Sequence, residues 1–349
     1  MSDPRKISSA DADRRPPGLL VLSIQLASLV LLLFVISLAI GPVGLSPGEV
    51  AAGLFGAGES AASIIVQEIR VPRSLLAMLV GGTLGLAGAA LQGFLRTPLA
   101  APSLLGAPAA AALAAVLSVA IGLVGALSTA LPLAAIAGAV LSVGFLLIFA
   151  GARAGLLVVI LAGLAISAIA AAGTALVLHL APTRFDDVEM SFWLLGSLEN
   201  RSLEHVAIAA PFMIASWVLL GWDRLAFRAL TMGEDVAEGL GINLRAVRLR
   251  VVAGVAIGVG AVVSVAGAIG FVGLVAPQLM RPFVNHDPAR LLVPAALAGA
   301  AMLLVADILV RLIPSPTEIN LGIVTTLIGA PFFVAMIMQH RRKILGEPN

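Results

Sequence analysis

The chain has 349 residues, of which 60% are hydrophobic and 11% are charged. An ordinary soluble domain carries roughly 25% charged residues, so this composition predicts an integral membrane protein. The chain contains no cysteine, which excludes disulfides and thiolate chemistry, and its net charge of +2 comes from scattered arginines, which argues against nucleic-acid binding.

Ten apolar runs are predicted to span a membrane, because a spanning helix needs about 20 apolar residues. Six runs are each long enough for one helix: Gly18 to Gly41, Ser74 to Leu95, Leu156 to Leu180, Val206 to Trp222, Leu291 to Arg311, and Ile319 to Gln339. The run Thr97 to Ala152 is predicted to hold two helices that meet near Leu131 and Pro132. The run after Arg250 is predicted to hold two more, which divide near Gly267, Gly270 and Gly273 and end at about Val284. The first run is too long for a signal peptide, whose apolar core has about 7 to 15 residues. The sequence therefore predicts an all-α integral membrane protein with about ten transmembrane helices. A single transmembrane domain over residues 18–340 is expected between tails 1–17 and 341–349.

The basic residues predict the orientation of these spans. An even number of spans places both termini on one side, and by the predicted topology that side carries 16 of the 21 lysines and arginines. The opposite side carries the other five, which are Arg70, Arg73, Arg184, Arg201 and Arg311. Because cytoplasmic loops are enriched in basic residues, both termini are predicted to be cytoplasmic.

Glycines four residues apart recur within the predicted spans. Gly81 and Gly85 form one such pair, and Gly254 and Gly258 form another. Small residues at this spacing let helix backbones approach closely in lipid. The pattern predicts tight helix packing, and a glycine that lines a pathway is the alternative.

A polar segment, residues 231–246, follows the sixth span on the predicted cytoplasmic side. Thr231 followed by Glu234 fits a capping box, which predicts the start of a short helix. Gly239 and Gly241 can supply the left-handed residue that ends such a helix. A second helix that bears basic residues is predicted to follow it.

Two roles are open for this segment, whose second helix bears Arg245 and Arg248. It is either a solvated connector or a docking element for a cytoplasmic partner, because so short a helix gains order mainly from packing. The chain itself has only two lysines, Lys6 and Lys343, and neither lies in a GxxxxGK[ST] loop. Any ATP chemistry must therefore come from another chain.

Basic residues at the outer mouths of spans run against the positive-inside bias. Arg70, Arg73 and Arg311 are either snorkelling anchors or partners for carboxylates of an external protein. Asp307 lies four residues before Arg311, so the two can neutralise each other on one helix. The four histidines lie apart and predict no zinc site. His179, near the outer end of the fifth span, is either an interfacial residue or a ligand contact.

Several blocks resemble the FecCD family, the permease subunits of binding-protein-dependent importers for iron-siderophore complexes, haem and cobalamin. The blocks are RVPRSLLAMLVGGTLGLAGAALQGFLRTPLAAPSLLG (Arg70 to Gly106), FWLLGSLENRSLEHV (Phe192 to Val206), MGEDVAEGLGI (Met232 to Ile242), AGAIGFVGLVAPQLMR (Ala266 to Arg281), LLVADILVRL (Leu303 to Leu312) and LGIVTTLIGAPFF (Leu321 to Phe333). The resemblance covers essentially the whole chain after its N-terminal tail.

This resemblance implies a type II ABC importer permease architecture with ten spans in the bacterial inner membrane, surrounded by lipid. The chain would be a translocation subunit and not an enzyme. Its implied partners are a second copy of itself, two cytoplasmic ATPase subunits that bind ATP and Mg, and a periplasmic binding protein. No cofactor is implied in this chain.

The resemblance also assigns roles to individual residues. Those implied to dock the binding protein are Arg70, Arg73 and Arg311. Those implied to couple to the ATPase are Gly233, Glu234, Asp235, Ala237, Leu240 and Gly241. A turn implied to help close the cytoplasmic gate is Thr97, Pro98 and Leu99, with threonine where the family has asparagine. Residues implied to line the pathway, together with the last span, are Gly163, Leu164 and Ser167. Gln278 stands where many relatives have histidine, and no role is assigned to it.

The expected cargo is an iron chelate, with iron-siderophore ranked first, haem second and cobalamin third. A pathway rich in alanine, leucine and glycine suits a large, partly apolar chelate. The alternative function is an ion-coupled secondary transporter of a small solute, which needs membrane-buried ionisable residues. Asp307 is the clear candidate for such a residue.

Overall fold

A computed structural model describes residues 18–56, 60–123, 130–150, 156–180, 194–313 and 319–345, and every regular element within these ranges is helical. The longer helices are α1 (Leu19–Ala39), α4 (Val71–Leu95), α5 (Ala107–Ala120), α7 (Ala130–Ala150), α8 (Leu156–His179), α10 (Leu203–Trp222), α13 (Leu244–Ala266), α15 (Pro288–Leu312) and α16 (Leu321–Leu345). The shorter elements are α2 (Pro47–Phe55), α3 (Ala61–Ile64), the π-helical η1 (Ile65–Arg70), the 3-10 turn η2 (Pro102–Leu105), α11 (Arg224–Leu230), α12 (Glu234–Gly239), α14 (Val272–Met280) and the 3-10 turn η3 (Arg281–Val284).

Each predicted apolar run contains a helix, but the helices differ in their capacity to span a bilayer. Within the described residues, seven segments are long and apolar enough: α1, the continuous stretch from α3 to α4, α7, α8, α10, α13 and α15. The apolar parts of α5 and α16 are shorter, and α14 has nine residues. The fold is thus an all-helical membrane protein, and the count of ten spans stays a prediction. The N-terminal tail, Arg153 and Arg184 lie outside the described residues.

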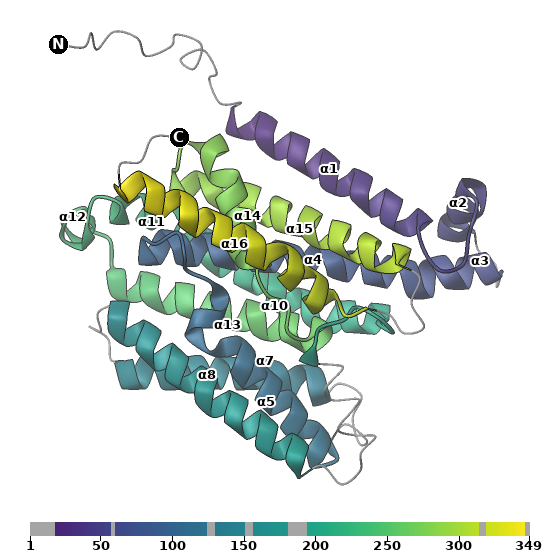
Figure 1. The fold of residues 1–349 in the computed structure, drawn as a ribbon, viewed down its shortest axis with the longest axis horizontal. Helices are drawn as coiled ribbons and strands as arrows, with labels where there is room; N and C mark the ends of the chain where they lie inside the picture. Colours follow the sequence, from purple (N-terminus) through teal and green to yellow (C-terminus); the bar gives the residue numbers. More distant parts are fainter. Residues whose placement is uncertain are drawn as a thin grey trace.

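The bundle is built around α4, which is the most buried of the long helices. In α4, 83% of the most apolar stretch is buried inside the protein, whereas the value for the peripheral α1 is 11%. Figure 1 shows α11 and α12 at one end of the bundle and α2 and α3 at the opposite end. We call these the α12 end and the α2 end. Helix α1 begins and α16 finishes toward the α12 end (Figure 1).

Glycines in the spans serve close packing, as their spacing predicts. A Cβ atom added at Gly81 would collide with the carbonyl oxygen of Gly299, and one at Gly85 would collide with that of Ala295. Both contacts join α4 to α15. Gly258 of α13 faces the side chain of Ser216 in α10 just as closely. In lipid, such backbone approach replaces the hydrophobic effect as the source of helix association.

Between α1 and α4, the chain forms helices that the sequence analysis did not predict. Ser46 caps α2, because its hydroxyl accepts the N–H of Glu49 and the Glu49 carboxylate accepts the N–H of Ser46. Hydrogen bonds from the Ser46 backbone and hydroxyl lower the pKa of Glu49. The signal was present in the sequence, since Ser-Pro-Gly-Glu combines a capping box with proline at the first helical position.

Candidate functional site

The segment that follows α11 at the α12 end corrects the predicted cap. Thr231 does not cap α12, because its hydroxyl donates to the Arg228 carbonyl at 2.7 Å and so belongs to the end of α11. The N-cap of α12 is Gly233, whose φ of 114° turns the chain sharply. Glycine adopts this conformation without steric cost. Gly241, with φ of 84°, follows α12 as the left-handed residue, whereas Gly239 lies inside the helix.

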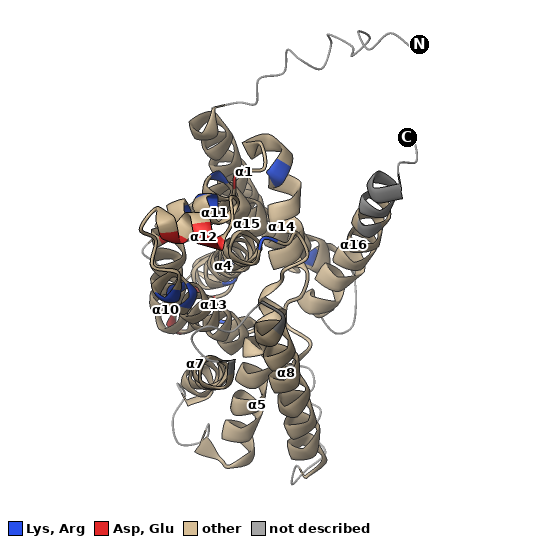
Figure 2. Cartoon of the chain, turned by 90° about the vertical axis from the view of Figure 1, so that its left-hand side faces the viewer, with Lys and Arg blue, Asp and Glu red and all other residues tan. Residues whose placement is uncertain are grey.

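The predicted second helix of this segment is the beginning of α13. Asn243 caps α13, since its side-chain oxygen accepts the N–H of Ala246 at 3.1 Å. Arg245 and Arg248 therefore lie in the first two turns of a long helix that continues to Ala266. Figure 2 views the molecule from the α12 end and shows acidic residues on α12 with basic residues nearby. Because only four residues separate α12 from α13, a movement of α12 would act directly on α13, a helix long enough to span the membrane.

Helix α12 presents apolar side chains to its surroundings. Its Ala237 is fully buried and holds the helix against the bundle. Met232, Val236 and Leu240 are 59%, 45% and 63% exposed, although all three are large and apolar. Val236 lies within α12 and Leu240 follows one helical turn later as its C-cap, whereas Met232 precedes the Gly233 N-cap. We call these three exposed residues the apolar face of α12. Leu240 is among the predicted coupling residues, whereas the sequence analysis named neither Met232 nor Val236, and coupling through this helix stays a prediction.

An ion pair joins α12 to the end of α4. Arg96 and Glu234 lie 3.0 Å apart, and their side chains are 44% and 57% exposed. Arg96 follows the last residue of α4 with φ of 52°, the left-handed conformation in which a helix commonly ends. Exposed pairs of this kind contribute at most about 1 kcal/mol. The pair therefore positions α12 beside the chain that follows Arg96 and is weak enough to break.

The predicted gate residues Thr97, Pro98 and Leu99 form a turn directly after Arg96, which we call the 97–100 turn. The Thr97 hydroxyl accepts the N–H of Leu99 at 3.4 Å, and the Thr97 carbonyl accepts the N–H of Ala100 at 3.5 Å. Asparagine forms the same kind of turn through its side-chain oxygen. Threonine thus retains the side-chain acceptor that the turn requires.

The loop before α15 holds α11 in place. Arg228 of α11 donates to both carboxylate oxygens of Asp287, and Asp287 also accepts the N–H of Ala289 at the start of α15. Burial acts to raise the pKa of Asp287, but the hydrogen bonds from Arg228 and Ala289 outweigh it and lower the pKa. Through Asp287, α11 is therefore linked to the start of α15.

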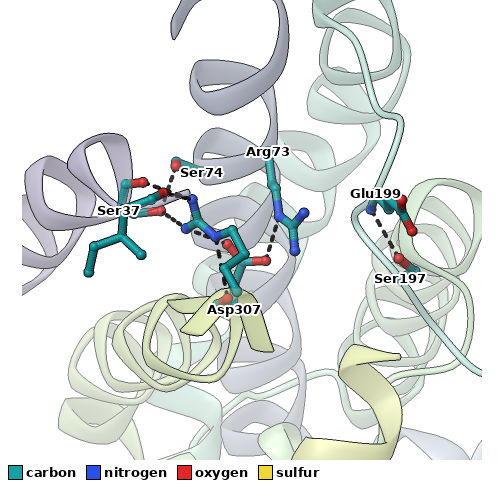
Figure 3. Close-up of polar contacts among 8 residues, drawn as sticks. Ser37, Arg73, Ser74, Ser197, Glu199 and Asp307 are labelled. Carbon is teal, nitrogen blue, oxygen red and sulfur yellow. Dashed lines mark hydrogen bonds and ion pairs between the residues drawn. The ribbon is translucent and has the colours of Figure 1, made fainter. Parts of the chain in front are cut away.

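At the α2 end, the three predicted docking arginines face inward. Asp307 of α15 is fully buried, and its two carboxylate oxygens lie 2.7 Å from the Arg73 Nε and 2.7 Å from the Arg311 Nη2. Figure 3 shows Arg73 and Asp307 pointing toward each other, with Ser37 of α1 beside them. The expected pairing of Asp307 with Arg311 is confirmed. In this structure, the Asp307 carboxylate forms ion pairs with two of the three arginines, Arg73 and Arg311.

Arg70 and Arg311 also cap the end of α1. Arg70 donates to the carbonyls of Leu38 and Ala39 at 2.8 and 3.0 Å, and Arg311 donates to those of Ser37 and Ile40 at 2.8 and 2.7 Å. The last carbonyls of a helix lack partners within the helix, and in a membrane they need others. The two arginines therefore attach α1 to η1 and α15. Their docking of a binding protein stays a prediction.

Replacing Arg70 with methionine should loosen the end of α1. Methionine keeps much of the side-chain length but cannot donate to the carbonyls of α1, and a lost buried hydrogen bond costs about 1–3 kcal/mol. Amides of residues 37–43 should then exchange with deuterium about tenfold to a hundredfold faster, measured by mass spectrometry. Arg96→Met, at the opposite end, is the control. Unchanged exchange at residues 37–43 would show that Arg70 does not hold α1.

Among the predicted pathway residues, Gly163 packs against η2, and its lining of a pathway stays a prediction. It is buried, and an added Cβ would collide with the carbonyl oxygen of Leu104 in η2. Leu164 is half exposed, and the Ser167 hydroxyl donates to the Gly163 carbonyl at 3.0 Å. Exposed apolar residues continue along α8 to His179, which is exposed. Lining of a pathway by Leu164 and Ser167 stays a prediction.

Comparisons with known proteins agree with this geometry. The profile of the FecCD transport family matches residues 29–339. The Fe(3+)-citrate import system permease protein of Bacillus subtilis is 36% identical over 320 residues, which are 91% of this chain and 95% of that protein. The hemin transport system permease protein of Yersinia pestis is 35% identical over 291 residues, covering 80% and 84% of the two chains. A solved inward-facing structure of a metal-chelate type ABC transporter superposes with a TM-score of 0.82 at 28% identity, covering 91% of this chain and 99% of that one.

Proposed function

The chain belongs to the FecCD transport family as an ABC importer permease, and we propose that it forms the membrane pathway of an ATP-driven importer for an iron chelate. As a permease, it is a translocation subunit and not an enzyme. The observation that carries the proposal is the exposed apolar face of Met232, Val236 and Leu240, at the end of a chain matched over almost its whole length. Such a face on an ordered helix fits a partner that supplies the energy.

The proposed assembly contains a second copy of the chain, two cytoplasmic ATPase subunits and a periplasmic binding protein. ATP and Mg would be bound by the ATPase subunits, because neither lysine of this chain lies in a phosphate-binding loop. Closure of the ATPase pair would move α12, and rigid-body tilting of the spans would follow. The binding protein would favour one permease state through differential affinity.

The proposed location is the bacterial inner membrane, with both termini in the cytoplasm. This places α12 on the cytoplasmic side and the arginine cluster on the periplasmic side. The beginning of α1 and the finish of α16 toward the α12 end support a shared side for the termini (Figure 1). The excess of basic residues predicted for that side supports the cytoplasm.

The proposed cargo remains an iron chelate, with iron-siderophore first and haem second, and the cobalt corrinoid cobalamin is ranked third. Relatives carry names that cover Fe(3+)-citrate, hemin, vitamin B12 and achromobactin. The exposed face of α8 is apolar at Leu164, Ile169 and Leu176, which suits a bulky chelate with apolar surface. Such a lining offers no strong ligand to the metal, so selectivity would reside in the binding protein.

Uptake into proteoliposomes tests the energy source. Vanadate, which traps ATPases, is expected to abolish accumulation of an iron-siderophore complex, and an uncoupler is expected to leave it unchanged. Asp307, the candidate for ion coupling, is paired with Arg73 and Arg311 in this structure. Uptake that stops with the uncoupler and continues with vanadate would replace the proposal with a secondary transporter.

A further inference from the structure

A buried polar cluster lies directly behind the 97–100 turn. Gln92 of α4 is 1% exposed, and its amide nitrogen donates to the carbonyls of Ala100 and Leu274 at 3.3 and 3.4 Å. Its amide oxygen accepts from Gln278 at 2.9 Å and from Arg281 at 3.0 Å. The Gln92 side chain therefore uses both of its donor hydrogens and both acceptor positions.

Gln278 connects this cluster to the turn itself. The same amide nitrogen that donates to Gln92 also donates to the carbonyl of Pro98 at 2.5 Å. Proline has no N–H, so the Pro98 carbonyl is the main-chain group through which this residue can be held. Two elements far apart in the sequence, the end of α4 and the middle of α14, thus meet through one side chain.

The 97–100 turn is held unequally on its two sides. On one side, the exposed Arg96–Glu234 pair links it to α12, and such pairs are weak. On the other side, the amide cluster lies behind the turn, with Gln92 fully buried, and buried networks whose groups are all satisfied are stiff. A force that moves α12 will therefore break the ion pair before it detaches the turn from α14.

We propose that Gln278 is a positioning residue that fastens the 97–100 turn to α14, so that this turn of the cytoplasmic gate moves only when α14 itself moves. The gate assignment rests on the proposed function, whereas the fastening rests on the four hydrogen bonds of Gln92 and the bond to Pro98. Release of the turn then depends on the displacement of α14 relative to α4. The sequence analysis noted Gln278 but assigned it no role, because its partners lie about 180 residues away along the chain.

The absence of cysteine from the chain permits a direct test. Leu99 is 44% exposed, so Leu99→Cys places a single reporter thiol in this subunit on the turn. The complete transporter in inverted vesicles is treated with a membrane-impermeant maleimide, with and without ATP and vanadate. Labelling rates are compared for the parent, Gln278→Leu and Gln278→His, because leucine removes both donors at similar volume and histidine restores a ring N–H.

In the absence of nucleotide, Gln278→Leu is expected to raise the labelling rate at position 99 by about fivefold or more, the consequence of two lost hydrogen bonds. Gln278→His should return the rate toward that of the parent. ATP consumed per chelate imported should rise in Gln278→Leu. Leu279→Ala, an exposed neighbour on α14, should leave labelling and stoichiometry unchanged.

A second reporter separates fastening from general loosening. Ala115 of α5 is 1% exposed, so Ala115→Cys should stay unlabelled in every variant. An unchanged labelling rate at position 99 in Gln278→Leu would overturn the proposal, as would labelling of Ala115→Cys in that variant. If the parent labels equally in all nucleotide states, the gate assignment is wrong, and the comparison of Gln278→Leu with the parent still decides whether Gln278 fastens the turn.

Discussion

Aspartates in place of Met232 and Leu240 are expected to abolish assembly of the chain with its ATPase subunits. Both side chains are exposed in the isolated subunit, so the change should not disturb folding. In the assembled complex each aspartate would place an unpaired charge in an apolar contact. Truncation of a central contact residue often costs about 2 kcal/mol or more, so the combined loss should exceed a hundredfold in affinity.

Copurification of the ATPase with the tagged permease measures this effect, and the amount of permease in the membrane measures insertion. Glu238→Gln, an exposed change on the same helix, is the matched control and should copurify normally. Normal insertion together with lost copurification supports docking through α12. Full copurification of the Met232→Asp, Leu240→Asp variant would show that the apolar face of α12 does not contact the ATPase.

Asp307→Ala should be the most destabilising single substitution in the arginine cluster. It removes the carboxylate that lies 2.7 Å from both Arg73 and Arg311, and it leaves two guanidinium groups in a buried setting without that counter-charge. Breaking a buried ion pair by removing one partner costs about 3–5 kcal/mol. The purified variant should therefore lose its monodisperse elution profile at a clearly lower temperature than the parent.

The heating experiment in detergent needs a matched control of the same chemistry. Asp235→Ala removes an exposed aspartate from α12 and should leave the midpoint temperature unchanged. Asp307→Asn keeps the shape and loses the charge, so it should fall between the parent and Asp307→Ala. A midpoint for Asp307→Ala equal to that of the parent would mean that the cluster contributes nothing to stability, and the arginines would then be available for a partner.

The long helices could be predicted from the sequence because lipid imposes one simple requirement, about 20 apolar residues for each span. The break after Ala266 was also readable, since glycines interrupt the apolar run before Val272. The region between α1 and α4 was not predicted, because its helices are short and carry no long apolar run. Their presence depends on local caps such as Ser46 and on packing against η1.

The site was predicted unevenly for a related reason. The position of α12 followed from its polar composition, but its first residue did not, because Thr231 bonds backward to Arg228 and Gly233 turns the chain. The inward direction of Arg70 could not be foreseen, since its acceptors belong to a helix about 30 residues earlier. The close packing of Gly163 likewise could not be predicted, because the sequence does not show that η2 lies against it.

The attachment of α1 has a consequence for how this helix tolerates change. Arg70 and Arg311 donate mostly to main-chain carbonyl oxygens of residues 37–40, which every amino acid supplies. Exchanging one apolar side chain for another along the lipid-facing length of α1 should therefore leave these hydrogen bonds intact. An unrelated hydrophobic helix of equal length that ends at the same place would accept the same hydrogen bonds from the two arginines.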